Sequence, residues 1–127
     1  MSIAITDDHQ ALADTVASFL VKHDSRADAR ALLNGATAGV PAHWDELRGL
    51  GWLGLHLPEA HGGSGFGLPE LVVVIEQFGR AIATGPFVAS ATAGAVLATT
   101  GSDAQQAAHL PGLADGSRIG AVAFGGD

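Results

Sequence analysis

Apolar residues recur every three or four positions along most of this chain, which is the spacing of one face of an α-helix. Leu12, Val16 and Phe19 form the first such stripe, behind a Thr6 that can cap the helix. Glycine or proline stands at the ends of most later stripes, as expected where helices begin and end. The sequence therefore predicts about six helices, over residues 7–23, 25–33, 41–50, 69–83, 86–99 and 103–110.

The last ten residues depart from this helical pattern. Gly120 to Phe124 form a short apolar run between glycines, which favours a β-strand. An isolated strand leaves its N–H and C=O groups unpaired, so this one needs a neighbour in a longer chain or on a partner. We predict an all-α fold, a bundle of about six helices, that ends in one short C-terminal β-strand at residues 118–124.

The composition indicates one globular domain and narrows its partners. The 127 residues are 47% hydrophobic, enough for one core, and carry a formal charge of −7. Nucleic acid binds basic surfaces, so we expect no nucleic acid partner. The chain has no cysteine and no apolar run near the ~20 residues of a membrane helix. We therefore expect no thiolate chemistry, no membrane contact and a cytoplasmic location.

The segment 57–67 contains four glycines and is the first candidate for chemistry. A dinucleotide fingerprint counted from Gly63 requires glycine where Leu68 stands, and a phosphate-binding P-loop requires a lysine that the segment lacks. A nucleophile elbow at Ser64 requires glycine where Phe66 stands. We interpret the segment as a glycine turn that redirects the chain between two helices.

Histidine, glutamate and tryptophan side chains near this segment are further candidates. His56 and His61 have no third ligand at metal-site spacing, so no metal site is predicted. Glu59 and His61 could form an acid–base pair, but no nucleophile or second carboxylate lies near them, so no catalytic residue is assigned. Trp44 and Trp52 are expected in core or interface packing rather than around a cofactor.

The order of motifs in the middle of the chain resembles the N-terminal helical domain of flavin-dependent acyl-CoA dehydrogenases. In that family a helix ending in Leu-Gly leads through an apolar segment to Pro-Glu, two glycines, and a helix rich in Val, Ile and Glu. Residues 101–106 and the turn at 111–116 resemble the family's sixth helix and its exit, so the resemblance spans most of residues 5–124. The central elements are Leu50-Gly51, Pro58-Glu59, Gly62-Gly63 and residues 69–79.

The resemblance implies a three-part enzyme that oxidises an acyl-CoA between its α and β carbons, using FAD. This chain would supply the helical N-terminal domain, residues 1–117, and the first strand of an absent middle β-domain, residues 118–127. The family's catalytic glutamate belongs to the C-terminal part, so the chain alone should be inactive and should bind no FAD by itself. Its implied partners are acyl-CoA in the complete enzyme, the remaining dehydrogenase domains and further subunits, with a homo-oligomer as the assembly.

The resemblance also implies where the acyl group and the flavin lie. The fifth helix lines the acyl cavity together with the fourth. Residues 89–95 all have small side chains, and a wall of small side chains leaves room for a bulky acyl group, branched or steroid-like. The family's strand continues into a Thr-Glu-Pro-like turn at the flavin, where this chain has residues 125–127, Gly-Gly-Asp. The substrate candidates, weighed evenly against core packing, are Phe87, Val88, Ala91 and Ala95, and the cofactor candidates are Val122 and Phe124.

Two other functions stay open on the sequence. The chain could be a non-catalytic subunit of a heteromeric dehydrogenase. It could also be a stand-alone helical interaction module that binds a partner through its apolar faces and the strand edge. Continuation of the reading frame into a β-rich segment would favour the dehydrogenase over the module.

Overall fold

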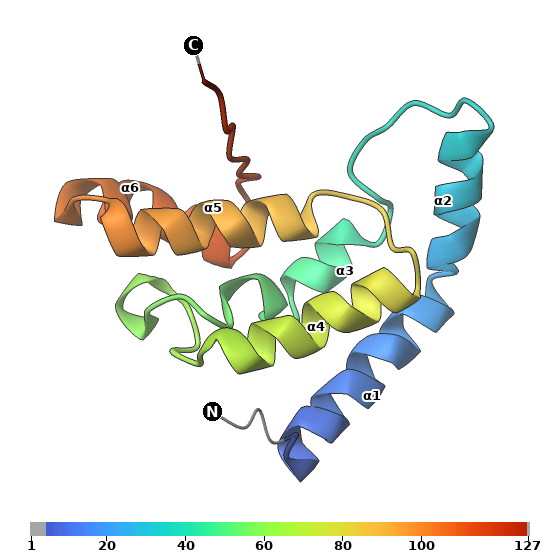
Figure 1. Ribbon diagram of the computed structural model, residues 1–127, viewed down its shortest axis with the longest axis horizontal. Helices are drawn as coiled ribbons and strands as arrows, with labels where there is room; N and C mark the ends of the chain where they lie inside the picture. Colours follow the sequence, from blue (N-terminus) through green and yellow to red (C-terminus); the bar gives the residue numbers. More distant parts are fainter. Residues whose placement is uncertain (1–4, 127) are drawn as a thin grey trace. The chain divides into compact units, whose positions relative to one another are not determined.

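The computed structural model describes residues 5–126, which form helices joined by irregular connections (Figure 1). The all-α prediction is confirmed. Residues 1–4 and 127, the outer ends of the two predicted domains, lie outside the described residues. The helices are α1 Asp7–Lys22, α2 Ser25–Leu33, α3 Trp44–Arg48, α4 Leu68–Arg80, α5 Phe87–Thr100 and α6 Asp103–Ala114, with the 3₁₀ helices η1 Trp52–Gly54 and η2 Glu59–His61.

The chain divides into two compact units. Unit 1 consists of Met1–Trp44 and Gly67–Gly85 and contains α1, α2 and α4. Unit 2 consists of Asp45–Phe66 and Pro86–Asp127 and contains η1, η2, α5 and α6.

In unit 1, α1 and α4 lie side by side (Figure 1). Burying one valine, leucine or phenylalanine side chain between two helices stabilises the fold by about 1.5–3 kcal/mol. This is enough to override the strand preference of the three valines at 72–74. Val74 packs inward and Val72 is exposed, as expected for a helix with one apolar face. The buried residues of the pair are Val16, Phe19 and Leu20 on α1 and Leu71, Val74 and Phe78 on α4.

Polar side chains fix where α1 and α4 begin. The Thr6 hydroxyl accepts a hydrogen bond from the His9 N–H (3.2 Å), and His9 Nδ1 accepts one from the Thr6 N–H (3.3 Å). This network assigns the proton of His9 to Nε2, which lies 3.1 Å from Glu70 Oε1. The Glu70 carboxylate also accepts from the Gly67 N–H (3.0 Å). Its hydrogen bond with His9 is the main cause that lowers the pKa of Glu70.

In unit 2, α5 and α6 pack on each other and on η1. The Ser102 hydroxyl accepts from the Gln105 N–H (3.3 Å), and the Gln105 side chain accepts from the Ser102 N–H (2.8 Å). This reciprocal cap starts α6 at the predicted position. The core cluster contains Leu57, Leu110, Leu113 and Ala114, with Leu97 and Ala98 packed against it.

The predicted end of the sixth helix is wrong. α6 does not end at Pro111 but continues to Ala114. A proline inside a helix removes one backbone hydrogen bond, which normally favours an end there. Continuation keeps Leu110, Leu113 and Ala114 on one buried face, and the burial of these side chains offsets the missing bond.

The third helix is shorter than predicted. It begins at Trp44 rather than near Pro41 and ends at Arg48. Trp44 and Leu47 are buried as expected, but Leu50 lies beyond the helix and is 42% exposed. A five-residue helix has little stability of its own, so packing of its two buried side chains sets its extent.

The predicted C-terminal strand is not formed. Residues 119–126 are irregular, and no strand occurs anywhere in residues 5–126. A strand requires a neighbouring strand for its backbone hydrogen bonds, and the helical units described here offer none. The Gly120 N–H instead donates to the Ser90 hydroxyl at 3.0 Å. That residues 118–124 open a β-domain in a longer protein stays a prediction.

Candidate functional site

The glycine loop between η1 and α4 uses its backbone donors internally. The N–H groups of residues 63–66 all donate to carbonyl groups of the preceding turn, over 2.8–3.0 Å. An anion cradle requires several N–H groups that converge on open space. The loop is therefore a folded turn, as predicted from the failed phosphate motifs, and not an anion site. The acceptors are the carbonyl oxygens of Pro58, Gly54, Leu57 and Leu55, for residues 63 to 66 in turn.

Three of the loop glycines are needed for this turn. Gly62 and Gly65 have φ values of +86° and +66°, which L side chains rarely adopt. At position 63 glycine is required for a different reason, because a Cβ atom there would overlap the carbonyl oxygen of Leu57. The glycines thus serve close backbone packing.

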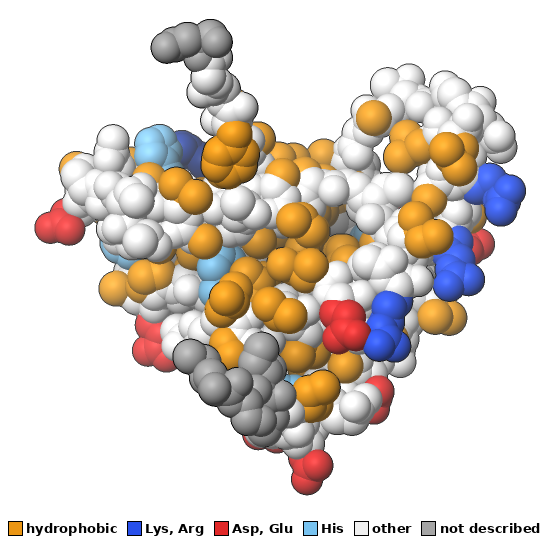
Figure 2. Space-filling model, in the orientation of Figure 1, with side chains coloured by type: hydrophobic (Ala, Val, Ile, Leu, Met, Phe, Trp, Pro, Cys, Tyr) orange, Lys and Arg blue, Asp and Glu red, His pale blue; other side chains and the backbone are white. Residues whose placement is uncertain are grey.

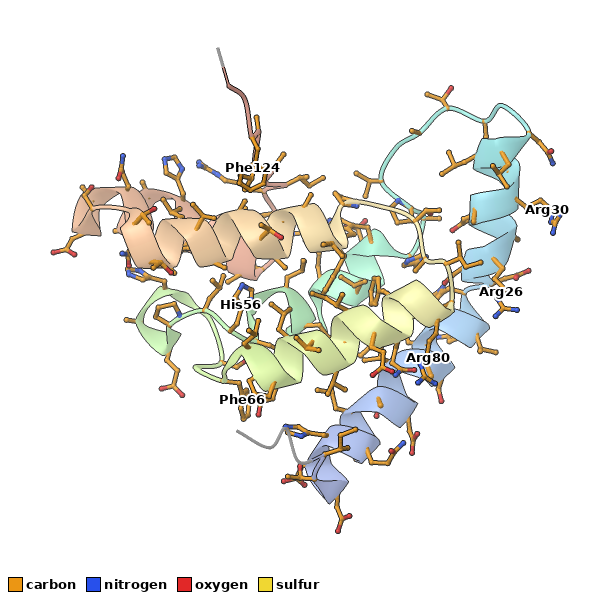
Figure 3. The ribbon with its side chains drawn as sticks, viewed as in Figure 1. Arg26, Arg30, His56, Phe66, Arg80 and Phe124 are labelled. Atoms are coloured by element: carbon orange, nitrogen blue, oxygen red, sulfur yellow. The ribbon has the colours of Figure 1, made fainter. Side chains whose placement is uncertain are left out.

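His56 connects the start of this loop to α5. Its Nε2 lies 2.9 Å from the carbonyl oxygen of Ala91, so this nitrogen donates, and Figure 3 shows the side chain directed toward α5. The Nδ1 atom is buried and has no hydrogen-bond partner among residues 5–126. Burial lowers the pKa of His56, and its hydrogen bond to Ala91 opposes this only in part. His56 is therefore a neutral donor that fixes one carbonyl of α5.

The sequence predicted no metal site and no membrane contact, and two structural findings concern these predictions. Within residues 5–126, no group of three or more His, Cys, Asp or Glu side chains is placed to hold a metal ion. In the same part of the chain, no helix is both long and apolar enough to cross a membrane.

Trp44 and Trp52 are each 5% exposed, in agreement with a packing role.

The four substrate candidates form a graded strip along α5. Phe87 and Ala91 are each 1% exposed, Ala95 is half-buried, and Val88 is 48% exposed. Their spacing places them within one arc of the helix that runs from the core of unit 2 to its surface. The structure therefore brings these residues together, and only Ala95 and Val88 have surface available to another molecule.

Two further small residues of α5 face the core, and the sequence analysis did not single them out. Ser90 is buried and accepts the hydrogen bond from Gly120. A Cβ atom at Gly94 would lie 3.1 Å from the side chain of Leu57, so only a small residue fits there. Their four-residue spacing places them on one face of the helix, and this was the signal in the sequence that could have identified them. Part of the small-residue run of α5 is thus explained by packing inside unit 2.

The two cofactor candidates differ in their surroundings. Val122 is half-buried and lines a hollow of about 740 Å³ formed by α5, α6 and the C-terminal segment. Phe124 is 91% exposed and projects from the segment (Figure 3). No Cβ atom built at Gly125 would meet another atom within 4 Å, so the backbone there is open to a close approach.

Residues 6–117, which include α1 to α6, match the family model described as acyl-CoA dehydrogenase, N-terminal domain. This chain belongs to the acyl-CoA dehydrogenase family. The resemblance predicted from the sequence is thereby confirmed.

Individual members of the acyl-CoA dehydrogenase family match almost the whole chain. Acyl-CoA dehydrogenase FadE12 of Mycobacterium tuberculosis (strain H37Rv) is 36% identical over 124 residues, which cover 94% of this chain and 31% of that protein. Mitochondrial isovaleryl-CoA dehydrogenase of Pongo abelii is 31% identical, over 94% of this chain and 29% of that protein. The chain thus spans about a third of the length of these relatives.

A solved structure gives the same family assignment. A variant of the Tcur3481-Tcur3483 steroid ACAD superposes with a TM-score of 0.78 at 32% sequence identity. The superposition covers 91% of this chain and 32% of that one. The helical arrangement is therefore one that the acyl-CoA dehydrogenase family uses for a part of a larger chain.

Proposed function

We propose that this chain is the N-terminal acyl-pocket and assembly domain of an FAD-dependent acyl-CoA dehydrogenase. The complete enzyme would form a double bond between the α and β carbons of an acyl-CoA. The observation that carries the proposal is the family match over residues 6–117 on a chain that spans about a third of its relatives. No catalytic residue is assigned to this chain, so it contributes binding surface and is inactive by itself.

The surface offered to the acyl group is the outer part of the α5 strip. Ala95 and Val88 are accessible, while Phe87 and Ala91 support them from the core. His56 holds the Ala91 carbonyl at 2.9 Å and so fixes the wall behind the acyl group. The small side chain of Ala95 leaves room for a bulky acyl group, and the similarity to a steroid ACAD supports this substrate class.

The FAD of the complete enzyme would meet this chain only at its C-terminal segment. The uncharged Val122 and the open backbone at Gly125 are compatible with a flat ring system, but they form only an edge of a binding site. When bound, FAD accepts the electrons that desaturation releases. Phe124, exposed here, would cover the flavin or pack in the β-domain that follows.

The proposal also covers the oligomeric state and the cellular location of the complete enzyme. We infer a homo-oligomeric enzyme, located in the cytoplasm. Exposed apolar residues such as Ile119 and Phe124 support contact with the remaining domains or subunits. A non-catalytic subunit of a heteromeric dehydrogenase is the alternative that the same features allow.

The substrate class can be tested in the complete enzyme by filling the acyl wall. Ala95→Leu adds three carbons to the accessible part of the strip. We expect kcat/KM for a ring-bearing acyl-CoA to fall about ten-fold or more, the effect of ~1.4 kcal/mol, while a straight-chain acyl-CoA is affected less.

The control is Ala107→Leu, which adds the same carbons at an exposed position of α6. It should leave both substrates unchanged. Equal losses for both substrates in Ala95→Leu, or a wild-type enzyme that prefers the straight chain, would contradict the bulky-acyl assignment.

A further inference from the structure

A second hollow lies in unit 1, and none of its lining residues belongs to the α5 strip. It has a volume of about 400 Å³ and is formed where α1 ends, α2 begins and α4 ends. Its floor is apolar, from Ala17, Leu20 and Ala81, and Val21 on its edge is 80% exposed. Val21 also lines the hollow, so its exposed side chain adds to the apolar area of the floor.

Basic residues gather around this hollow although the chain as a whole is acidic. The chain has six lysines and arginines and a formal charge of −7. Of the charged residues that line the hollow, Arg26 and Arg80 are basic and Asp24 is acidic, so the formal charge of its lining is +1. Figure 2 shows basic side chains over α2 and the end of α4, beside exposed hydrophobic ones.

The arginines of the rim are held by hydrogen bonds rather than extended at random. Arg26 Nη2 donates to the Arg80 carbonyl oxygen at 3.4 Å, and Arg80 pairs with Glu76 at 2.7 Å. Figure 3 places Arg26 and Arg30 along α2 and Arg80 at the end of α4. A positioned guanidinium next to an apolar floor suits a carboxylate that is attached to an apolar group.

Backbone strain is concentrated at the same place. Among residues 5–126, the non-glycine residues with positive φ are Asp24 (+47°) and Ile82 (+52°). Asp24 lines the hollow, and Ile82 follows the lining residue Ala81. Ile82 is β-branched and 62% exposed, so no core packing of its own explains the conformation. Strained residues of this kind cluster at binding and switch sites.

We propose that this hollow docks a segment of a partner protein in which an apolar side chain is flanked by carboxylates. The apolar side chain occupies the floor, and the carboxylates pair with Arg26 and Arg80. An anionic membrane is less suitable, because Asp24 and Glu76 in the rim repel a uniformly negative surface and the apolar area is a hollow rather than a broad face. The site lies apart from the α5 strip in sequence and does not depend on the acyl-CoA assignment.

The probe is a synthetic nine-residue peptide with one leucine between pairs of glutamates, added to the ¹⁵N-labelled 127-residue chain. The readout is the shift of backbone amide NMR signals. We expect saturable shifts at Val21, Arg26 and Gln77, at peptide concentrations of about 1 mM or below, which corresponds to a weak protein–peptide contact. A peptide with glutamines in place of the glutamates, and one with alanine in place of the leucine, should each bind about ten-fold more weakly.

The matched variants are Arg26→Gln at the rim and Arg118→Gln on unit 2, which remove the same charge from different surfaces. Only Arg26→Gln should weaken binding by about ten-fold. The peptide series on the wild-type chain decides the question even if a variant fails to fold.

Several results would overturn the proposal. These are no saturable shift up to several millimolar, shifts confined to unit 2, equal binding of the glutamine peptide, or equal weakening by Arg118→Gln. Shifts that grow with protein concentration without peptide would identify a second copy as the occupant instead. Co-sedimentation with phosphatidylserine vesicles that Arg26→Gln abolishes, with no peptide binding, would identify an anionic lipid surface instead.

Discussion

Replacing Gly63 with alanine tests the conclusion that the glycine loop is a packed backbone turn. The new Cβ atom would overlap the Leu57 carbonyl oxygen, which is backbone and cannot rotate away. The two backbone segments of the turn must separate, and the hydrogen bonds donated by residues 63–66 lengthen or break. At a net ~1 kcal/mol per bond, the loss of two to four bonds costs about 2–4 kcal/mol.

Urea unfolding followed by circular dichroism measures this cost. For a domain of this size, a loss of about 2–4 kcal/mol lowers the urea midpoint by about 1–3 M. The chain supplies two matched controls. Gly62→Ala meets no atom but keeps φ at +86°, so it should cost about 1–2 kcal/mol. Gly79→Ala lies inside α4, meets no atom and should stabilise by about 0.5–1 kcal/mol.

The order of the three variants is the decisive result. If Gly63→Ala unfolds at the same urea concentration as Gly62→Ala, the close backbone approach does not stabilise the turn. If Gly79→Ala destabilises as much as either loop variant, the difference between loop and helix glycines is wrong.

Two further predictions concern His56 and Pro111. Burial lowers the pKa of His56, so as the pH falls the imidazole is protonated in the unfolded chain before it is protonated in the folded one. The contribution of His56 to the free energy of unfolding is therefore complete above the unfolded pKa near ~6.5 and falls as the pH drops through the lower folded pKa. His56→Gln keeps a donor for Ala91 but has no proton to gain, so its urea midpoint should fall less between pH 7 and pH 5 than that of the wild type, and equal losses would refute the role of His56. Pro111→Ala restores the missing donor inside α6 and should stabilise the chain by about 1 kcal/mol or more in thermal unfolding, because proline is the least favourable residue in a helix interior. An unchanged or lower midpoint would mean that Pro111 stabilises α6 through its contacts.

Helix type and most helix starts could be predicted from the sequence because their causes are local. Thr6 and Ser102 cap helices through residues three positions later, and Pro69 lies in the first turn of α4. The family resemblance was also readable, since it depends on the order of short motifs such as Pro58-Glu59 and Gly62-Gly63. Errors arose at helix ends, where capping signals compete with distant packing.

The candidate site could be predicted only in part. The strip of Phe87, Val88, Ala91 and Ala95 follows from helical spacing, but which of them is accessible depends on what packs against α5. His56 forms a hydrogen bond with Ala91, which is 35 positions away in the sequence, and nothing in the local sequence of either residue predicts that contact. The same holds for Ser90, whose partner Gly120 lies 30 residues away.

By itself, the sequence determined the helical class, the family and the exclusion of phosphate, dinucleotide and nucleophile motifs from the glycine loop. These conclusions rest on periodicity, caps and residue identities, which act within a few positions of the chain. The tertiary structure decided that α6 continues past Pro111, that residues 118–124 form no strand here, and that Arg26 and Arg80 meet at one hollow. Each of these depends on groups far apart in sequence, and their energies exist only after the chain has brought those groups together.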